Sequence, residues 1–139
     1  MGECTFALNT STGNGGALRN TGTVLLVNST FTSNLAPSSG AISSFVTSGP
    51  GAVLSANNCA IARNSATDPA SAFGGGVRNT SAAILYNTIV AGNTAPTGPD
   101  LSGAFLTGGH NRNGVGAASN GFMDGGPEFD QVGPVDLPA

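Results

Sequence analysis

The residues of this chain that could do acid–base chemistry lie in its second half. His110 is the only histidine, and Asp100 and Arg112 lie near it in the sequence. An imidazole with a carboxylate and a guanidinium nearby can accept a proton or orient a phosphate or carboxylate group. His110 also lies in a Gly-Gly-His-Asn run, which is typical of a turn residue bonded to backbone. The three residues are therefore catalytic candidates, and a turn role for His110 is the preferred alternative.

Other signs of a catalytic or metal centre are absent from the sequence. No carboxylate occurs between Glu3 and Asp68, and most later acidic residues gather in a Gly/Pro-rich tail. Cys4 and Cys59 belong to no Cys-x-x-Cys or Cys/His cluster, so we expect neither a metal site nor a cofactor. P-loop, nucleophile-elbow and His-Glu-x-x-His motifs are also missing. The sequence favours a protein without catalytic activity, and a hydrolase or lyase fragment acting on a polysaccharide or small ester is the alternative.

The composition limits the partners of the chain. Its 139 residues include 22 glycines, only 8% are charged, and the net charge is -3. The four cationic residues are arginines scattered along the chain, at positions 19, 63, 78 and 112. Nucleic-acid binding requires a basic surface, so we expect no nucleic-acid partner. No run approaches the roughly 18 apolar residues of a membrane span.

A repeated segment indicates the elements that position these residues. It occupies residues 3–9, 28–34, 58–64 and 87–93, and its closing asparagines are 25, 30 and 29 residues apart. Two other short lines recur within each repeat, and Gly, Ser, Thr, Asn and Pro separate them. All three lines are too short for helices and show no sustained 3.6-residue apolar period. Three strands and three turns per repeat predict an all-β, right-handed parallel β-helix (a β-solenoid) of about three to four coils.

Stacking of the coils in register would turn the aligned positions into columns. The apolar columns, such as Phe6 with Phe31, must face inward because only the interior is dry. Stacked asparagines can hydrogen-bond from coil to coil, as buried amides require. We therefore predict two inward asparagine ladders, one of Asn9, Asn34, Asn64 and Asn93, the other of Asn28, Asn58 and Asn87. Cys4 and Cys59 share a column two coils apart, about 9.6 Å, which is too far for a disulfide.

Two runs of the sequence resemble a known family of coils. They are Gly-Gly-Gly-Val-Arg-Asn at 74–79 and Asn-Thr-Ile-Val-Ala-Gly-Asn-Thr-Ala at 87–95. These runs are similar to the coils of bacterial right-handed parallel β-helix repeat proteins, long surface or secreted polypeptides of planctomycete and cyanobacterial type. The resemblance implies the same fold and a structural or adhesive role. It also implies an extracellular or cell-surface location for the parent protein.

The sequence further predicts how the chain is divided. Coils are expected over 1–113, and an irregular Gly/Pro-rich tail over 114–139 packs on the last coil or extends from it. The chain enters repeat sequence directly after Met1 with no signal peptide. We therefore expect it to be a piece of a longer protein whose N-terminal coil has no cap.

The middle strand of the repeat departs from the usual alternation of apolar and polar residues. If the inward assignment is right, four apolar side chains of this strand face outward, Leu25, Val27, Ile84 and Tyr86, and Ile89 lies beside them across the corner as part of the same candidate interface. Such a patch usually has a partner. We predict a homo-oligomer formed through open coil ends or this outward face, with carbohydrate as a second kind of partner. The alternative is that the loop at 66–73, the tail or a slipped register covers the patch.

Overall fold

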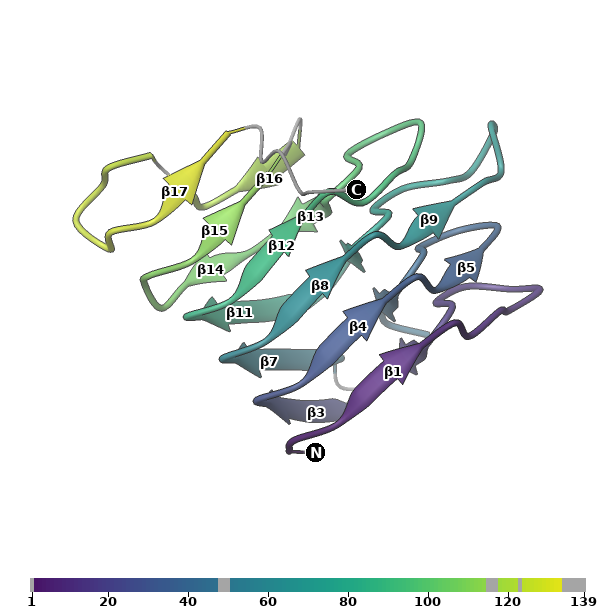
Figure 1. The fold of residues 1–139 in the computed structure, drawn as a ribbon, viewed down its shortest axis with the longest axis horizontal. Coiled ribbons are helices and arrows are strands. Elements are labelled where there is room, and N and C mark those ends of the chain that lie inside the picture. Colours follow the sequence, from purple (N-terminus) through teal and green to yellow (C-terminus); the bar gives the residue numbers. More distant parts are fainter. Residues whose placement is uncertain (1, 48–50, 115–117, 123, 134–139) are drawn as a thin grey trace.

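The computed structural model describes residues 2–47, 51–114, 118–122 and 124–133, and they contain strands but no α-helix. All paired strands run parallel, each to its counterpart in the next coil. Figure 1 shows the strands of successive coils lying side by side from the N-terminus to the C-terminus. The prediction of an all-β parallel β-helix is confirmed.

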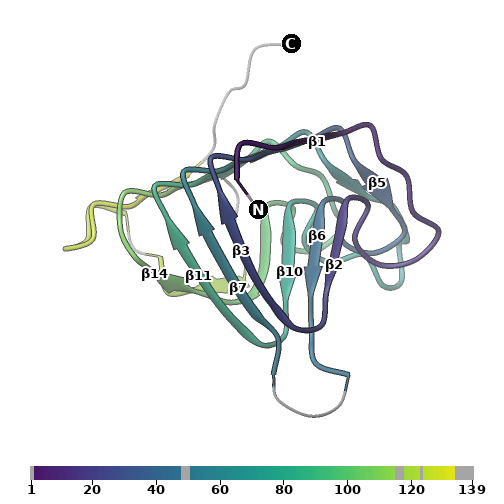
Figure 2. The ribbon, with the colours of Figure 1, turned by 90° about the horizontal axis from the view of Figure 1, so that it is seen from below.

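Each sheet takes at most one strand from a coil, and the sheets form the walls of the solenoid (Figure 2). The six-stranded sheet contains β1 (Thr5–Ala7), β4 (Thr30–Thr32), β8 (Ala60–Ala62), β12 (Ile89–Ala91), β15 (Arg112–Asn113) and β17 (Gln131–Val132). The five-stranded sheet contains β2 (Leu18–Asn20), β6 (Ile42–Ser44), β10 (Val77–Asn79), β13 (Leu101–Ala104) and β16 (Ala118–Asn120). The four-stranded sheet contains β3 (Thr23–Val27), β7 (Val53–Asn57), β11 (Ala82–Tyr86) and β14 (Leu106–Thr107). A two-stranded sheet pairs β5 (Leu35–Ala36) with β9 (Ser65–Ala66).

The core consists of the apolar columns that the repeat predicts. Phe6 pairs in register with Phe31, and Phe31 with Ile61. The rings of Phe6 and Phe31 are stacked with centroids 4.6 Å apart. Phe31 is fully buried, whereas Phe6 in the first coil is only partly buried. The core is therefore closed in the middle coils and partly open to solvent at the N-terminal coil.

One predicted asparagine ladder is present in the interior. Asn34 donates through Nδ2 to Oδ1 of Asn64 at 2.8 Å, and Asn64 donates in the same way to Asn93 at 2.8 Å. Asn9 begins the series with a 2.9 Å bond to Asn34. The backbone N–H of each of these residues also bonds to the Oδ1 of the next rung. The amide oxygens of Asn34, Asn64 and Asn93 therefore each accept two hydrogen bonds, which offsets the cost of burying them.

The second predicted ladder is wrong. Asn28, Asn58 and Asn87 are exposed, and their φ angles are 49°, 53° and 44°. They lie at the corner where the chain passes from the four-stranded to the six-stranded sheet. This left-handed backbone conformation costs asparagine less than most residues, which explains the residue type at the corner. The turn directs their side chains outward, so they do not form an inward ladder.

Strand pairing continues beyond residue 113. β16 pairs with β13, and β17 pairs with β15, both in parallel. The region that we expected to be an irregular tail therefore contributes two strands to the existing sheets. Residues 134–139 lie outside the described part of the chain.

Candidate functional site

Asp100, one of the catalytic candidates, terminates the asparagine ladder. Its Oδ1 accepts hydrogen bonds from Asn93, 2.9 Å from the backbone nitrogen and 2.8 Å from Nδ2. These are the bonds that the next asparagine of the ladder would accept. The Asp100 side chain is 2% exposed. Its carboxylate therefore has a structural role in the interior of the solenoid.

A second polar column, which was not predicted, lies just before the strands of the six-stranded sheet begin, whereas the asparagine ladder lies just after they end. Asn111 accepts a 3.0 Å bond from the backbone nitrogen of Thr88. Its own backbone nitrogen and Nδ2 donate to Oδ1 of Asp130, at 2.8 and 3.0 Å. In earlier coils the equivalent positions are Ser29 and Cys59, whose small side chains concealed the pattern. The alignment of Thr88 with Asn111 is the sequence signal that could have revealed it.

The structure does not bring the three catalytic candidates together at one surface. His110 is exposed, and its ring is stacked on Phe129 with centroids 5.5 Å apart. Arg112 donates to Oε1 of Gln131 at 3.1 Å in an exposed contact. Asp100, in contrast, is directed inward toward Asn93. A carboxylate in the interior cannot orient an imidazole on the outer surface, so this geometry gives no acid–base pair.

The two cysteines lie in one column, separated by the coil that contains Ser29, and both are free thiols. Cys59 is buried, and burial raises the pKa of its thiol. Cys4 is only partly buried. Because the thiolate is the reactive species, the two residues should differ in reactivity.

We expect a thiol reagent to modify Cys4 in the native protein and Cys59 only after unfolding. The rate of labelling with a chromogenic disulfide, followed at neutral pH and again in denaturant, measures this difference. A Cys4→Ser variant should then show almost no native reaction. Equal native rates for both thiols would contradict the burial of Cys59.

The outer face of the four-stranded sheet is mainly apolar, with Thr23, Ser55 and Asn57 among its apolar side chains. Register pairing places Leu25, Ser55, Ile84 and Leu106 in one row across its four strands. Leu25 is 54% exposed and Leu106 65%. Val53 is also exposed, whereas Val27, Ile84 and Tyr86 are half-buried. We call this surface, formed by these residues of β3, β7, β11 and β14, the apolar face.

Two of the expected coverings of the apolar face, a slipped strand register and the loop after β9, can be checked in the structure. Leu26 and Leu85, which alternate with its residues, are fully buried, so the strands have the expected orientation. The loop after β9 bonds instead to Ala36 and Pro37 near β5. Ile89, which was expected across the corner from these residues, is exposed on the neighbouring six-stranded sheet. Among the described residues, neither the loop nor a slipped register covers the apolar face.

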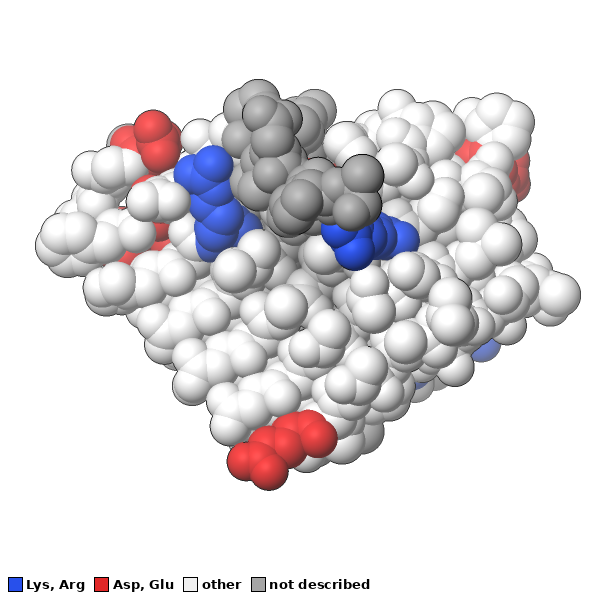
Figure 3. All heavy atoms as spheres, in the orientation of Figure 1, with Lys and Arg blue, Asp and Glu red and all other residues white. Residues whose placement is uncertain are grey.

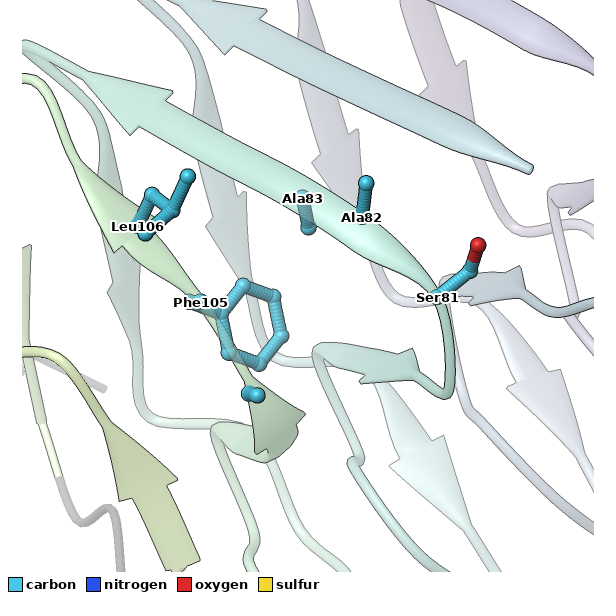
Figure 4. Close-up of a pocket in the computed structure, with 6 residues that line it drawn as sticks. Ser81, Ala82, Ala83, Phe105 and Leu106 are labelled. Carbon is cyan, nitrogen blue, oxygen red and sulfur yellow. The ribbon is translucent and has the colours of Figure 1, made fainter. Parts of the chain in front are cut away.

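A recess of about 250 Å³ lies at one end of the apolar face (Figure 4). Small side chains at the start of β11, Ser81, Ala82 and Ala83, form one side, and Phe105 and Leu106 form the other. Phe105 is almost completely buried and packs at a tilt against Phe122. The lining is therefore mainly apolar and suited to an aliphatic or aromatic side chain.

Charged side chains are sparse on the molecular surface. Figure 3 shows one face of the molecule that is mostly uncharged, with separate groups of acidic and basic residues. Arg19 lies over the ring of Phe45 and Arg78 over that of Phe73. No cluster of three or more potential metal-binding side chains occurs in the described ranges. Among the same residues, no helix is long and apolar enough to cross a membrane.

Together these features define a parallel β-solenoid with polar ladders inside and an apolar sheet face outside. In comparisons with known proteins, no family model, no curated protein and no solved structure matches the chain. The function is therefore inferred from the surfaces of the molecule.

Proposed function

We propose that the protein is a structural and adhesive part of a bacterial surface or secreted β-helix repeat protein, and that it acts through shape and self-association. The apolar face carries this proposal. It presents Leu25, Val53 and Leu106 to solvent on a sheet that is otherwise regular. Contiguous exposed apolar surface on a soluble domain usually marks an interaction site. The bacterial source and the extracellular location rest on the sequence resemblance alone.

A second copy of this chain is the partner that best fits the apolar face. The strands β3, β7, β11 and β14 contain no charged residue, so two copies of the face can meet without burying a charge. A two-fold axis brings the same patch of both copies together, which is the commonest arrangement of homodimers. Each copy can also offer the recess beside Phe105 to an apolar side chain of the other.

The N-terminal coil offers a second route to association. β1, β2 and β3 are the edge strands of their sheets in the described structure. Phe6, Leu18 and Val24 beneath these edges are only partly buried. Edge strands with apolar residues beneath them readily pair with other strands. Substitutions in the apolar face can distinguish association through the edge strands from association through the apolar face.

Replacing both Leu25 and Ile84 with threonine is expected to weaken the dimer while the solenoid stays folded. Threonine suits strands and solvent, and each lost apolar side chain removes about 1.5–3 kcal/mol of burial. A two-fold dimer loses each contact twice, so the dissociation constant should rise at least about a hundredfold. Sedimentation equilibrium over micromolar concentrations measures the change.

The control is Val46→Thr, which alters an exposed apolar residue outside the apolar face. It should leave the dissociation constant unchanged. A wild-type protein that stays monomeric at every workable concentration would remove the self-association proposal. If the double variant assembles as the wild type does, the copies associate through the edge strands of the N-terminal coil rather than through the apolar face.

A further inference from the structure

Two neighbouring columns on the six-stranded sheet change character in the last three coils. The corner column consists of Glu3, Asn28, Asn58, Asn87, His110 and Phe129, all at positive φ. The adjacent strand column begins with small residues, Thr5, Thr30 and Ala60, and continues with Ile89, Arg112 and Gln131. In the strand column, Ile89, Arg112 and Gln131 thus replace the smaller residues of the earlier coils. In the corner column, His110 and Phe129 lie beside Arg112 and Gln131 on the last two rungs.

The fold itself does not require these residue types. Asparagine makes the same corner at three earlier positions, with φ between 44° and 53°. His110 and Phe129 adopt φ of 59° and 57°, a conformation that is uncommon for residues other than glycine and that histidine adopts more readily than phenylalanine. Such positions are often retained for the side chain that they present. The imidazole and the phenyl ring at this corner are therefore candidates for a role on the outer surface.

These side chains line an open recess of about 380 Å³. That volume falls within the roughly 300–1,000 Å³ of typical ligand sites. Phe129 is 70% exposed and Ile89 46%, so the recess has apolar surfaces that face solvent. The polar groups come from Asn87, His110, Arg112 and Gln131. With coils about 4.8 Å apart, the two columns extend for about 10 Å.

The chemistry of the lining indicates the kind of ligand. Arg112 is the one permanently charged residue of the recess, and a guanidinium matches the planar geometry of a carboxylate. The side chains of Asn87, Gln131 and His110 can both donate and accept hydrogen bonds, as sugar hydroxyls require. Phe129 offers a ring face to an apolar surface of the ligand. The buried carboxylate of Asp130, which follows Phe129 in the chain, is directed inward to Asn111 and does not line the recess.

We propose that the recess formed by Asn87, His110, Phe129, Ile89, Arg112 and Gln131 binds a carboxylated saccharide. The carboxylate contacts Arg112, the hydroxyls contact the amides and the imidazole, and a C–H face of the sugar packs on Phe129. A single guanidinium suits one carboxylate better than a phosphate dianion, which is usually held by several cations. This inference goes beyond self-association, since Leu25 and Ile84 of the apolar face lie on another sheet.

Titration calorimetry of the full chain with trigalacturonate tests the proposal, with neutral maltotriose as the comparison. Trigalacturonate should bind, and maltotriose should bind at least about tenfold more weakly because it lacks the charge-assisted contact. Arg112→Gln and Phe129→Asn should each raise the dissociation constant for trigalacturonate by at least about tenfold. Phe129→Asn restores the residue type of the corner column, so it should fold even if Arg112→Gln does not.

Arg19→Gln is the matched control, because Arg19 also lies beside an aromatic ring but outside the recess. It should leave binding unchanged, and so should the double variant of Leu25 and Ile84 used for the apolar face. The proposal is overturned if trigalacturonate shows no binding at about 10 mM. Equal binding of maltotriose, or full binding by the Phe129→Asn protein, would overturn it as well. None of these results depends on whether the protein self-associates.

Discussion

Replacing Asn64 with leucine is expected to lower the free energy of unfolding by at least about 3 kcal/mol. Asn64 is fully buried and is the central rung of the ladder. Its Oδ1 accepts two bonds from Asn34, at 3.0 Å from the backbone nitrogen and 2.8 Å from Nδ2. Its Nδ2 donates to Asn93 and to the carbonyl oxygen of Phe31. Leucine would leave several buried polar groups without partners, each costing about 1–3 kcal/mol.

Asn58→Gly is the matched control for this experiment. Asn58 has the same side chain but is exposed at a corner with φ of 53°. Glycine adopts this conformation readily, so the stability should change by less than about 1 kcal/mol. Chemical denaturation followed by circular dichroism gives both values. If the Asn64→Leu protein is as stable as the Asn58→Gly protein, the ladder does not stabilise the fold.

The second large effect is expected from Phe31→Ala, which should cost about 3–5 kcal/mol of stability. Phe31 is fully buried between Phe6 and Ile61 in the central core. Truncation removes its burial and leaves a cavity, because strands paired on both sides cannot collapse into the space. The denaturation midpoint and the slope of the transition measure the loss.

Phe6→Ala makes the same substitution one coil earlier, where the side chain is only partly buried. We expect it to cost no more than about half as much, because less apolar area leaves water on folding. Both variants should be compared at low protein concentration. An equal cost for the two would mean that the N-terminal coil is covered in solution, and the result would then support association through the edge strands.

The fold could be predicted because the sequence repeats. Phe6, Phe31 and Ile61 occupy the same position of the repeated segment, which places them in one column although the repeats differ in length. The direction of a single side chain is harder to predict, because it depends on backbone angles that the spacing does not reveal. Asn28 and Asn34 illustrate this, since one turns outward at a left-handed corner and the other bonds inside.

The candidate site was less predictable for a different reason. His110 and Arg112 are candidates because of their residue types. Their contacts on the surface are with Phe129 and Gln131, which belong to a coil with little repeat sequence. Asp100 was assigned to the same constellation because it is near in sequence. Its contact with Asn93 closes a ladder that begins in the first coil, and such a contact follows from stacking rather than from any local motif.

The ladder gives the solenoid a direction. Each side-chain amide from Asn9 to Asn93 donates to the next rung toward the C-terminal coil, and those of Asn34, Asn64 and Asn93 also accept from the rung before. A carboxylate can only accept, so Asp100 ends the series, and Asp130 ends the parallel series through Asn111. The array is therefore polar, like a filament with unlike ends. The series can be extended on the side of Asn9, whose amide oxygen can still accept, whereas on the other side it ends in two carboxylates that have no proton to donate to a further rung.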